Sequence, residues 1–291
     1  MLKFEKKLIE WLNRHMIFIA LVFVILAAGW MRLAGRNFIG TDYHYSLYDI
    51  PGNCSSVLYR LMIRLFMKTD YVVVLVKLLA YAGDFGVALL TFLLVHKENQ
   101  RITDLRTFLT VTACLLSPVV LIYGIGGMEI DSVCMCFLLL GLWLYKKAGF
   151  LPAVLLMMPG AFLYTAYWPV VIGVSIYLFL KQGHAEESNR KMLAGMAALG
   201  LGFLLSVFIE NAGLGYGYYW VKLFVVNPET GVGYENPLQY FLAMVKIYGY
   251  FAATGSMLIS FRNKKWRVPA LVLQVLVLMY VGWNMTAHLA V

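Results

Sequence analysis

Residues 148–180, AGFLPAVLLMMPGAFLYTAYWPVVIGVSIYLFL, contain no charged side chain and yet are too long for one membrane crossing. A single helix over this stretch would measure about 50 Å, whereas the hydrocarbon core of a bilayer is about 30 Å thick. The stretch contains Pro152, Pro159 and Pro169, and proline removes a backbone hydrogen bond from a helix. It therefore predicts a hairpin of two short helices with a turn near 160–169.

The composition of the chain excludes a soluble globular protein. Hydrophobic residues make up 62% of the 291 residues and charged residues 13%, against roughly 45–50% and about 25% in soluble domains. The mean hydropathy is +0.76. So much apolar surface also excludes a disordered chain and a disulfide scaffold. We therefore expect an all-α polytopic integral membrane protein.

Further apolar runs divide the chain into segments of membrane-crossing character. With the hairpin counted as two, they predict about nine hydrophobic segments in a single transmembrane domain, 1–291. The additional runs are 15–31, 71–95, 107–128, 132–145, 192–209, 236–261 and 268–291. Residues 1–14 alternate Lys with apolar residues and predict an amphipathic helix on the inner membrane surface.

The net charge of +9 is a topology signal and not a sign of nucleic-acid binding, because Lys and Arg cluster between the apolar runs. A cytoplasmic N-terminus places sixteen of the 24 basic residues inside, and with nine segments the C-terminus is extracytoplasmic. The sixteen are Lys3, Lys6, Lys7, Arg14, Lys97, Arg101, Arg106, Lys146, Lys147, Lys181, Arg190, Lys191, Arg262, Lys264, Lys265 and Arg267.

This topology leaves two long outer loops, 33–70 and 211–237. Within the first loop, residues 55–68 carry apolar side chains at helical spacing and predict an amphipathic helix on the outer surface. Carboxylates gather on the same side, among them Asp42, Glu129 and Asp131. Such acids deprotonate hydroxyls or hold divalent metals, but outer acids are also often only solvated or placed at helix N-termini.

Two ionisable residues fall inside the second span. Lys77 and Asp84 are seven residues apart, on one face of a helix. Lys77 lies near the outer end and is expected to extend toward the interface, while Asp84 is deeper and needs a partner. A structural contact between helices and a catalytic role are both open for Asp84.

A loose pattern now connects these residues. Arg32, Arg36 and the pair Asp42-Tyr43 follow the first span, and Gly126-Gly127-Met128-Glu129-Ile130-Asp131 precedes the segment before the hairpin. Over about 32–180 the chain resembles the GT-C superfamily of membrane glycosyltransferases, near the mannosyltransferases that use polyprenyl-phosphate sugars. It departs from many relatives in carrying Glu129 where they have Gln, and in lacking a Lys at the hairpin break.

The resemblance implies an enzyme that transfers a sugar from a polyprenyl-phosphate donor to a hydroxyl of a glycan, lipid or protein acceptor at the outer face. Asp42 would be the general base, and Arg36 and Lys222 would hold the donor phosphate. Glu129 and Asp131 would orient the acceptor, or Asp42 and Asp131 would hold Mg²⁺ or Mn²⁺. A second membrane subunit would supply acceptor recognition if the chain alone does not.

Two other classes of function remain open. A transporter or flippase of a lipid-linked glycan would need polar residues deep in the membrane and usually shows internal symmetry, and no repeat is visible here. A non-catalytic membrane subunit would need no acid at Asp42. The sequence contains no Walker loop, HExxH or GxSxG motif, which argues against an ATPase or a standard hydrolase.

Overall fold

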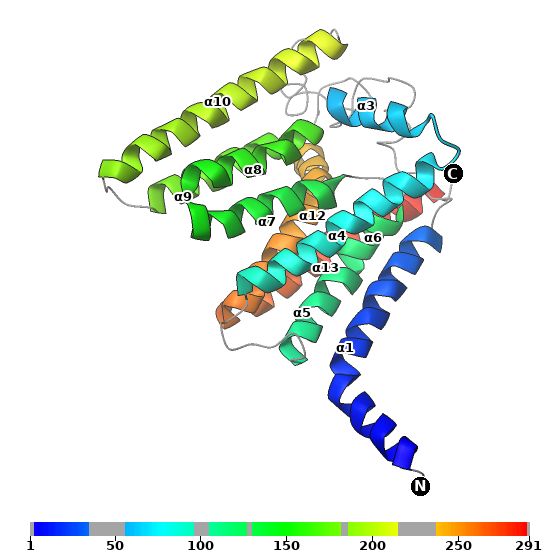
Figure 1. Ribbon diagram of the computed structural model, residues 1–291. Coiled ribbons are helices and arrows are strands. Elements are labelled where there is room, and N and C mark those ends of the chain that lie inside the picture. Colours follow the sequence, from blue (N-terminus) through cyan, green and yellow to red (C-terminus); the bar gives the residue numbers. More distant parts are fainter. Residues whose placement is uncertain are drawn as a thin grey trace.

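The computed structural model describes residues 3–34, 56–95, 105–126, 130–181, 186–214 and 237–289, and all regular structure in these ranges is helical. The helices are α1 (Lys3–Ala34), α3 (Val57–Phe66), α4 (Val72–Val95), α5 (Leu105–Leu116), α6 (Pro118–Gly126), α7 (Asp131–Ala148), α8 (Phe150–Leu163), η1 (Thr165–Tyr167), α9 (Trp168–Lys181), α10 (Glu186–Leu214), α12 (Pro237–Arg262), η2 (Lys264–Trp266) and α13 (Arg267–Leu289). Figure 1 shows them as one bundle, with α10 along one side and α1 along the other.

Three of the described helices are long and apolar enough to cross a membrane: His15–Ala34 within α1, Val72–Val95 and Asn189–Ala212 within α10. Among the described residues, fewer helices are long and apolar enough to cross a membrane than the nine segments expected from the sequence, because several of the apolar runs fold into shorter helices. Phe150–Leu163 and Thr165–Lys181, for example, are too short to span the core alone. The N-terminal residues from Lys3 continue into the first span as one 32-residue helix.

The hairpin predicted from 148–180 is confirmed. α8 ends at Leu163, a single 3₁₀ turn follows, and α9 begins at Trp168. Pro169 occupies the first turn of α9, where the missing backbone N–H breaks no helical hydrogen bond. The chain reverses where Tyr164 takes an extended conformation.

The single segment predicted over 107–128 is wrong. The structure divides it at Ser117 into α5 and α6, with Pro118 as the first residue of the second helix. A proline disfavours helical geometry in the residue before it. Pro118 is visible in the sequence, but the run 107–128 has an ordinary length for one membrane span. Length therefore indicates a break only in the longer run, 148–180.

Close packing of α4, α7 and α8 forms the centre of the bundle. A Cβ atom on Gly83 of α4 would lie 2.6 Å from Ser132 Oγ of α7, and one on Gly160 of α8 would lie 3.0 Å from the Cα of Cys134. Ser132 Oγ also donates a hydrogen bond of 2.7 Å to the carbonyl of Ala80. Small residues let helices approach closely where lipid provides no hydrophobic drive for association.

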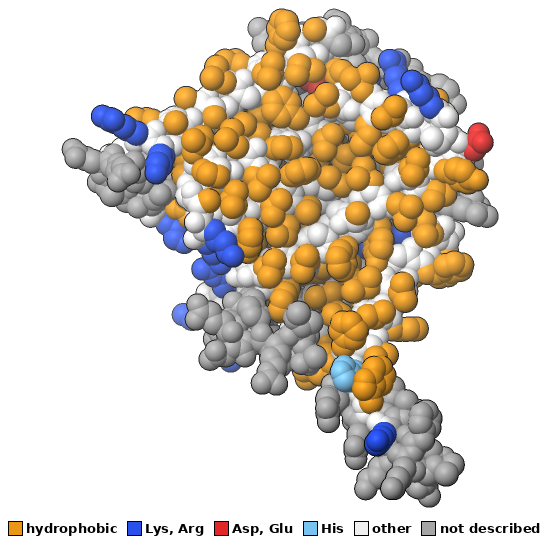
Figure 2. All heavy atoms as spheres, in the orientation of Figure 1, with side chains coloured by type: hydrophobic (Ala, Val, Ile, Leu, Met, Phe, Trp, Pro, Cys, Tyr) orange, Lys and Arg blue, Asp and Glu red, His pale blue; other side chains and the backbone are white. Residues whose placement is uncertain are grey.

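The two ends of the bundle differ in charge. At one end, which we call the basic end, Lys146 Nζ donates to the carbonyl of Leu94 at 3.3 Å and lies within electrostatic range of Lys181 and Arg262. Figure 2 shows Lys and Arg gathered at this edge of a largely apolar surface. At the opposite end, the α3 end, Ser56 Oγ donates to the carbonyl of Leu163 at the hairpin break.

Candidate functional site

Of the predicted site residues, the structure describes Asp131. Asp42, Glu129, Arg36 and Lys222 lie outside the described residues, so their predicted roles stay predictions.

Asp131 is buried at the start of α7, with 3% of its surface exposed. A carboxylate in the first turn is stabilised by the positive end of the helix dipole. The Tyr167 hydroxyl of the hairpin break donates to the Asp131 carbonyl at 3.4 Å, and the carboxylate lies within electrostatic range of Tyr250 and Cys134. Asp131 thus stands where α7, the hairpin break and α12 meet.

A second acid reaches the same end of the bundle from α10. Glu210 Oε1 accepts a hydrogen bond of 3.0 Å from the backbone N–H of Val57, at the start of α3. Glu210 also lies within electrostatic range of Arg60, and both side chains are 3% exposed. Among the described residues, Glu210 Oε2 has no hydrogen-bond partner.

Ser56 fixes α3 over this site. Its hydroxyl accepts from the N–H of Tyr59 at 3.1 Å, which caps the helix, and donates to the Leu163 carbonyl at 2.9 Å. One side chain therefore joins the start of α3 to the end of α8. The predicted amphipathic segment 55–68 is a helix, and its Arg60 points inward and not to the surface.

Lys77 of α4 is the fourth buried ionisable residue to be considered, after Asp131, Glu210 and Arg60. It is 1% exposed, so it is buried in the protein and does not extend to the surface as expected. Ala80 follows Lys77 by one helical turn. The Ala80 carbonyl accepts a hydrogen bond from Ser132, the residue next to Asp131. Arg60 and Glu210 lie within electrostatic range of each other, and Lys77 and Asp131 are buried on α4 and α7. We call these two cations and two acids, which come from four helices, the polar cluster.

Ionisable groups buried in a membrane protein are costly and usually mark a site of function. The cluster has the chemistry to bind a phosphate through its cations and to accept a proton or orient a hydroxyl through its acids. The sequence indicated Lys77 and Asp131 but missed the burial of Arg60 and of Glu210. The signal for Glu210 was its position directly after the uncharged run 192–209.

A second buried network joins α1, α4 and α12. Arg32 Nε and Nη2 both lie 2.7 Å from Asp84 Oδ2, and the Tyr250 hydroxyl donates to Asp84 Oδ1 at 2.5 Å. Arg32 also donates to the carbonyls of Ala28, at 2.9 Å, and Leu115, at 3.3 Å. Asp84 therefore has the partner it was expected to need, and we call Arg32, Asp84 and Tyr250 the buried triad.

A divalent metal was expected on Asp42 and Asp131. Within the ranges that the structure describes, no group of three or more His, Cys, Asp or Glu side chains is arranged to hold a metal ion. Asp131 supplies a buried carboxylate of the kind that Mg²⁺ and Mn²⁺ prefer, but one described ligand does not form a site.

No protein-family model, curated protein or solved structure matches the chain.

Proposed function

We propose that the protein is a membrane glycosyltransferase that moves a sugar from a polyprenyl-phosphate donor to an acceptor hydroxyl at the α3 end. The polar cluster carries this proposal, because four helices bury two cations and two acids at one end of the bundle. A donor of this kind has a long apolar tail and an anionic head group. Such a ligand needs helices for its tail and buried cations for its phosphate.

The predicted site segments adjoin this cluster in the sequence. The segment with Asp42 leads directly to Ser56, and Glu129 is two residues before Asp131. The predicted loop 211–237, which contains Lys222, begins directly after Glu210. These connections favour a site to which Asp42, Glu129 and Lys222 contribute together with the cluster.

In the proposed reaction, Asp42 takes the proton of the acceptor hydroxyl. The hydroxyl oxygen attacks the anomeric carbon with inversion, and the bond between that carbon and the phosphate oxygen breaks. Polyprenyl phosphate leaves, with its charge held by Arg36 and Lys222 and by the cations of the cluster. Glu129 and Asp131 orient the acceptor; alternatively, Asp42 and Asp131 would hold a Mg²⁺ or Mn²⁺ ion, which would supply positive charge to the departing phosphate.

We further propose that the basic end faces the cytoplasm and the α3 end the outside, because positive residues are retained on the cytoplasmic side. Asn263 lies in the exposed turn between α12 and α13, at the basic end. In a variant without native cysteines, Asn263→Cys should react with a membrane-impermeant maleimide only after the membrane is opened. Reaction in intact cells would reverse the orientation.

Donor turnover in reconstituted vesicles tests the function. Release of polyprenyl phosphate from a panel of polyprenyl-phosphate sugars reports cleavage whatever the sugar is. Asp42→Asn should lower the rate by about 10²–10⁴, the usual effect of losing a general base. Asp70→Asn is the control, because Asp70 is exposed in the turn before α4 and its loss should leave the rate unchanged.

The same assay separates the alternatives. A flippase would move the labelled lipid across the vesicle membrane without releasing polyprenyl phosphate. A non-catalytic subunit would do neither, and a normal rate in Asp42→Asn would remove Asp42 from the mechanism.

A further inference from the structure

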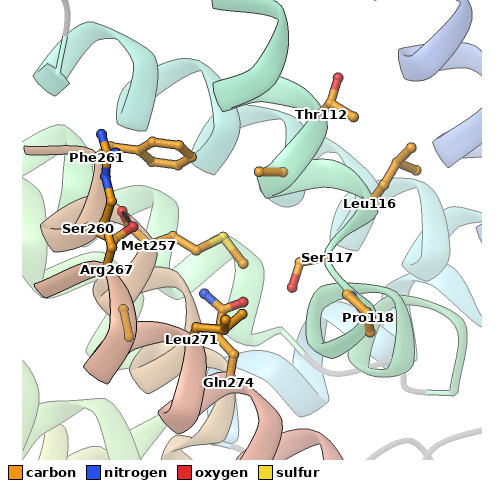
Figure 3. A pocket seen from close by; sticks show the side chains of 12 residues that line it. Thr112, Leu116, Ser117, Pro118, Met257, Ser260, Phe261, Arg267, Leu271 and Gln274 are labelled. Atoms are coloured by element: carbon orange, nitrogen blue, oxygen red, sulfur yellow. Dashed lines mark hydrogen bonds between the residues drawn. The ribbon is translucent and has the colours of Figure 1, made fainter. Parts of the chain in front are cut away.

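A cavity of about 400 Å³ lies between the α5–α6 break and the α12–α13 turn. Figure 3 shows the side chains around it. This volume is within the roughly 300–1,000 Å³ range of ligand pockets. The cavity is lined by Thr112, Ala113, Leu116, Ser117, Pro118, Met257, Ser260, Phe261, Arg267, Ala270, Leu271 and Gln274.

The inner part of the cavity holds a hydroxyl without a partner. Ser117 is 6% exposed, and its Oγ makes no hydrogen bond within the described part of the chain. Figure 3 shows this oxygen and the Gln274 amide directed into the same space, beside the Met257 side chain. A buried polar group without a hydrogen bond is costly, so the Ser117 hydroxyl indicates a ligand atom in this space, and the Gln274 amide faces the same space (Figure 3).

The opening of the cavity is cationic. Arg267 lines it, and Arg262, Lys264 and Lys265 lie in the same exposed turn. Neither α12 nor α13 contains a single acid to neutralise them. Arg267 and Gln274 are separated by two turns of α13, or about 10 Å. An anionic lipid therefore fits the cavity, with its head group at the opening and the polar linking region and an apolar chain further inside.

We propose that this cavity binds an anionic glycerophospholipid of the leaflet at the basic end. Its phosphate lies on Arg267, an ester carbonyl accepts a hydrogen bond from Ser117 Oγ, and one acyl chain packs on Leu116, Met257 and Leu271. The ester carbonyl distinguishes this ligand from polyprenyl phosphate, which has none, and the acyl chain distinguishes it from inorganic phosphate. The cavity opens beside Arg267 at the basic end, and its ligand is not a substrate of the proposed transferase.

Native mass spectrometry of the protein released from detergent micelles tests the proposal, with phosphatidylglycerol and phosphatidylcholine as probes. The wild type should retain one phosphatidylglycerol in preference to phosphatidylcholine, and inorganic phosphate should not displace it. Arg267→Gln should weaken phosphatidylglycerol binding about fivefold, the effect of one cation near a lipid surface. Arg190→Gln removes an exposed cation of the basic end that does not line the cavity, and it should leave binding unchanged.

The inner contact is tested separately. Ser117→Ala should weaken binding roughly two- to tenfold, the range of one neutral hydrogen bond, whereas Ser175→Ala, at a buried serine of α9, should have no effect. Ala113→Phe should abolish binding by filling the space. Equal retention of the two lipids, displacement by inorganic phosphate, or tighter binding of polyprenyl phosphate would overturn the proposal. So would a Ser117→Ala protein that binds like the wild type.

Discussion

The buried triad and the polar cluster both place ionisable groups inside the bundle, but they differ in how completely those groups are bonded. Both carboxylate oxygens of Asp84 accept hydrogen bonds, and every nitrogen of the Arg32 guanidinium has an acceptor. In the cluster, Glu210 Oε2 has no hydrogen-bond partner in the part of the chain that the structure describes. A fully bonded network holds helices together, whereas an open acceptor is available to a ligand.

The position of the triad supports a structural role. It joins α1, α4 and α12, and Arg32 reaches the carbonyl of Leu115 at the end of α5 as well. The Arg32 guanidinium also lies 5.3 Å from the centre of the Tyr81 ring, and the Tyr81 hydroxyl donates to the Ile25 carbonyl. The triad thus ties the first helix to the rest of the bundle, and through Tyr250 it lies within electrostatic range of Asp131 in the cluster that we propose to be functional.

The largest expected effect follows from breaking the triad. Asp84→Asn leaves the Arg32 charge buried without a counter-ion, which should cost about 3–5 kcal/mol of unfolding free energy. Tyr250→Phe removes one hydrogen bond and should cost about 1 kcal/mol. Thermal unfolding in detergent measures both. Replacing the pair together, as Arg32→Met with Asp84→Leu, should recover most of the loss, and no recovery would contradict a purely structural role.

An intermediate effect is expected for Ser56→Ala. The variant loses the α3 cap and the hydrogen bond to Leu163, so the unfolding free energy should fall by about 1–2 kcal/mol. Hydrogen exchange of the α3 amides should rise, because the start of the helix is no longer fixed. Ser175→Ala, whose hydroxyl has no partner among the described residues, should change the stability by no more than a few tenths of a kcal/mol.

Glu210→Gln tests whether the unbonded carboxylate oxygen of the cluster has a function. The amide oxygen still accepts from Val57, so the unfolding free energy should change by less than about 1 kcal/mol. The variant loses the negative charge beside Arg60 and the carboxylate oxygen that has no hydrogen-bond partner among the described residues. Donor turnover should therefore fall at least about tenfold. Unchanged turnover would make Glu210 a structural residue like Asp84.

The smallest effect belongs to the basic end. Burial and the nearby charges of Arg262 and Lys181 lower the pKa of Lys146 from its ordinary value of 10.5. The protonated form is therefore disfavoured in the folded protein, and stability should rise as the pH increases through the lowered pKa toward 10.5. Lys146→Gln should reduce this rise, which thermal unfolding between pH 7 and pH 10.5 would detect. An unchanged pH profile would exclude Lys146 as its source.

Local pattern determined much of the fold. Uncharged length and proline position predicted the hairpin of α8 and α9, and apolar spacing predicted α3. Both depend on residues close together in the chain, so the sequence contains the information directly. The count of spans was less accurate, because a run of apolar residues does not state how often it breaks. Pro118 divides one predicted span into two helices.

The pairing of distant residues was decided by tertiary structure alone. The sequence showed that Asp84 needed a partner, but 52 positions separate it from Arg32 and 166 from Tyr250. In the same way, Glu210 meets α3 across 153 positions. Side-chain pairs of this kind depend on how helices pack in space, and no periodicity along the chain encodes them. The amino-acid pattern therefore predicts an all-helical, apolar chain that carries acids and cations. Which of these charged groups are hydrogen-bonded to one another, and which keep an unbonded oxygen, follows from how the helices pack.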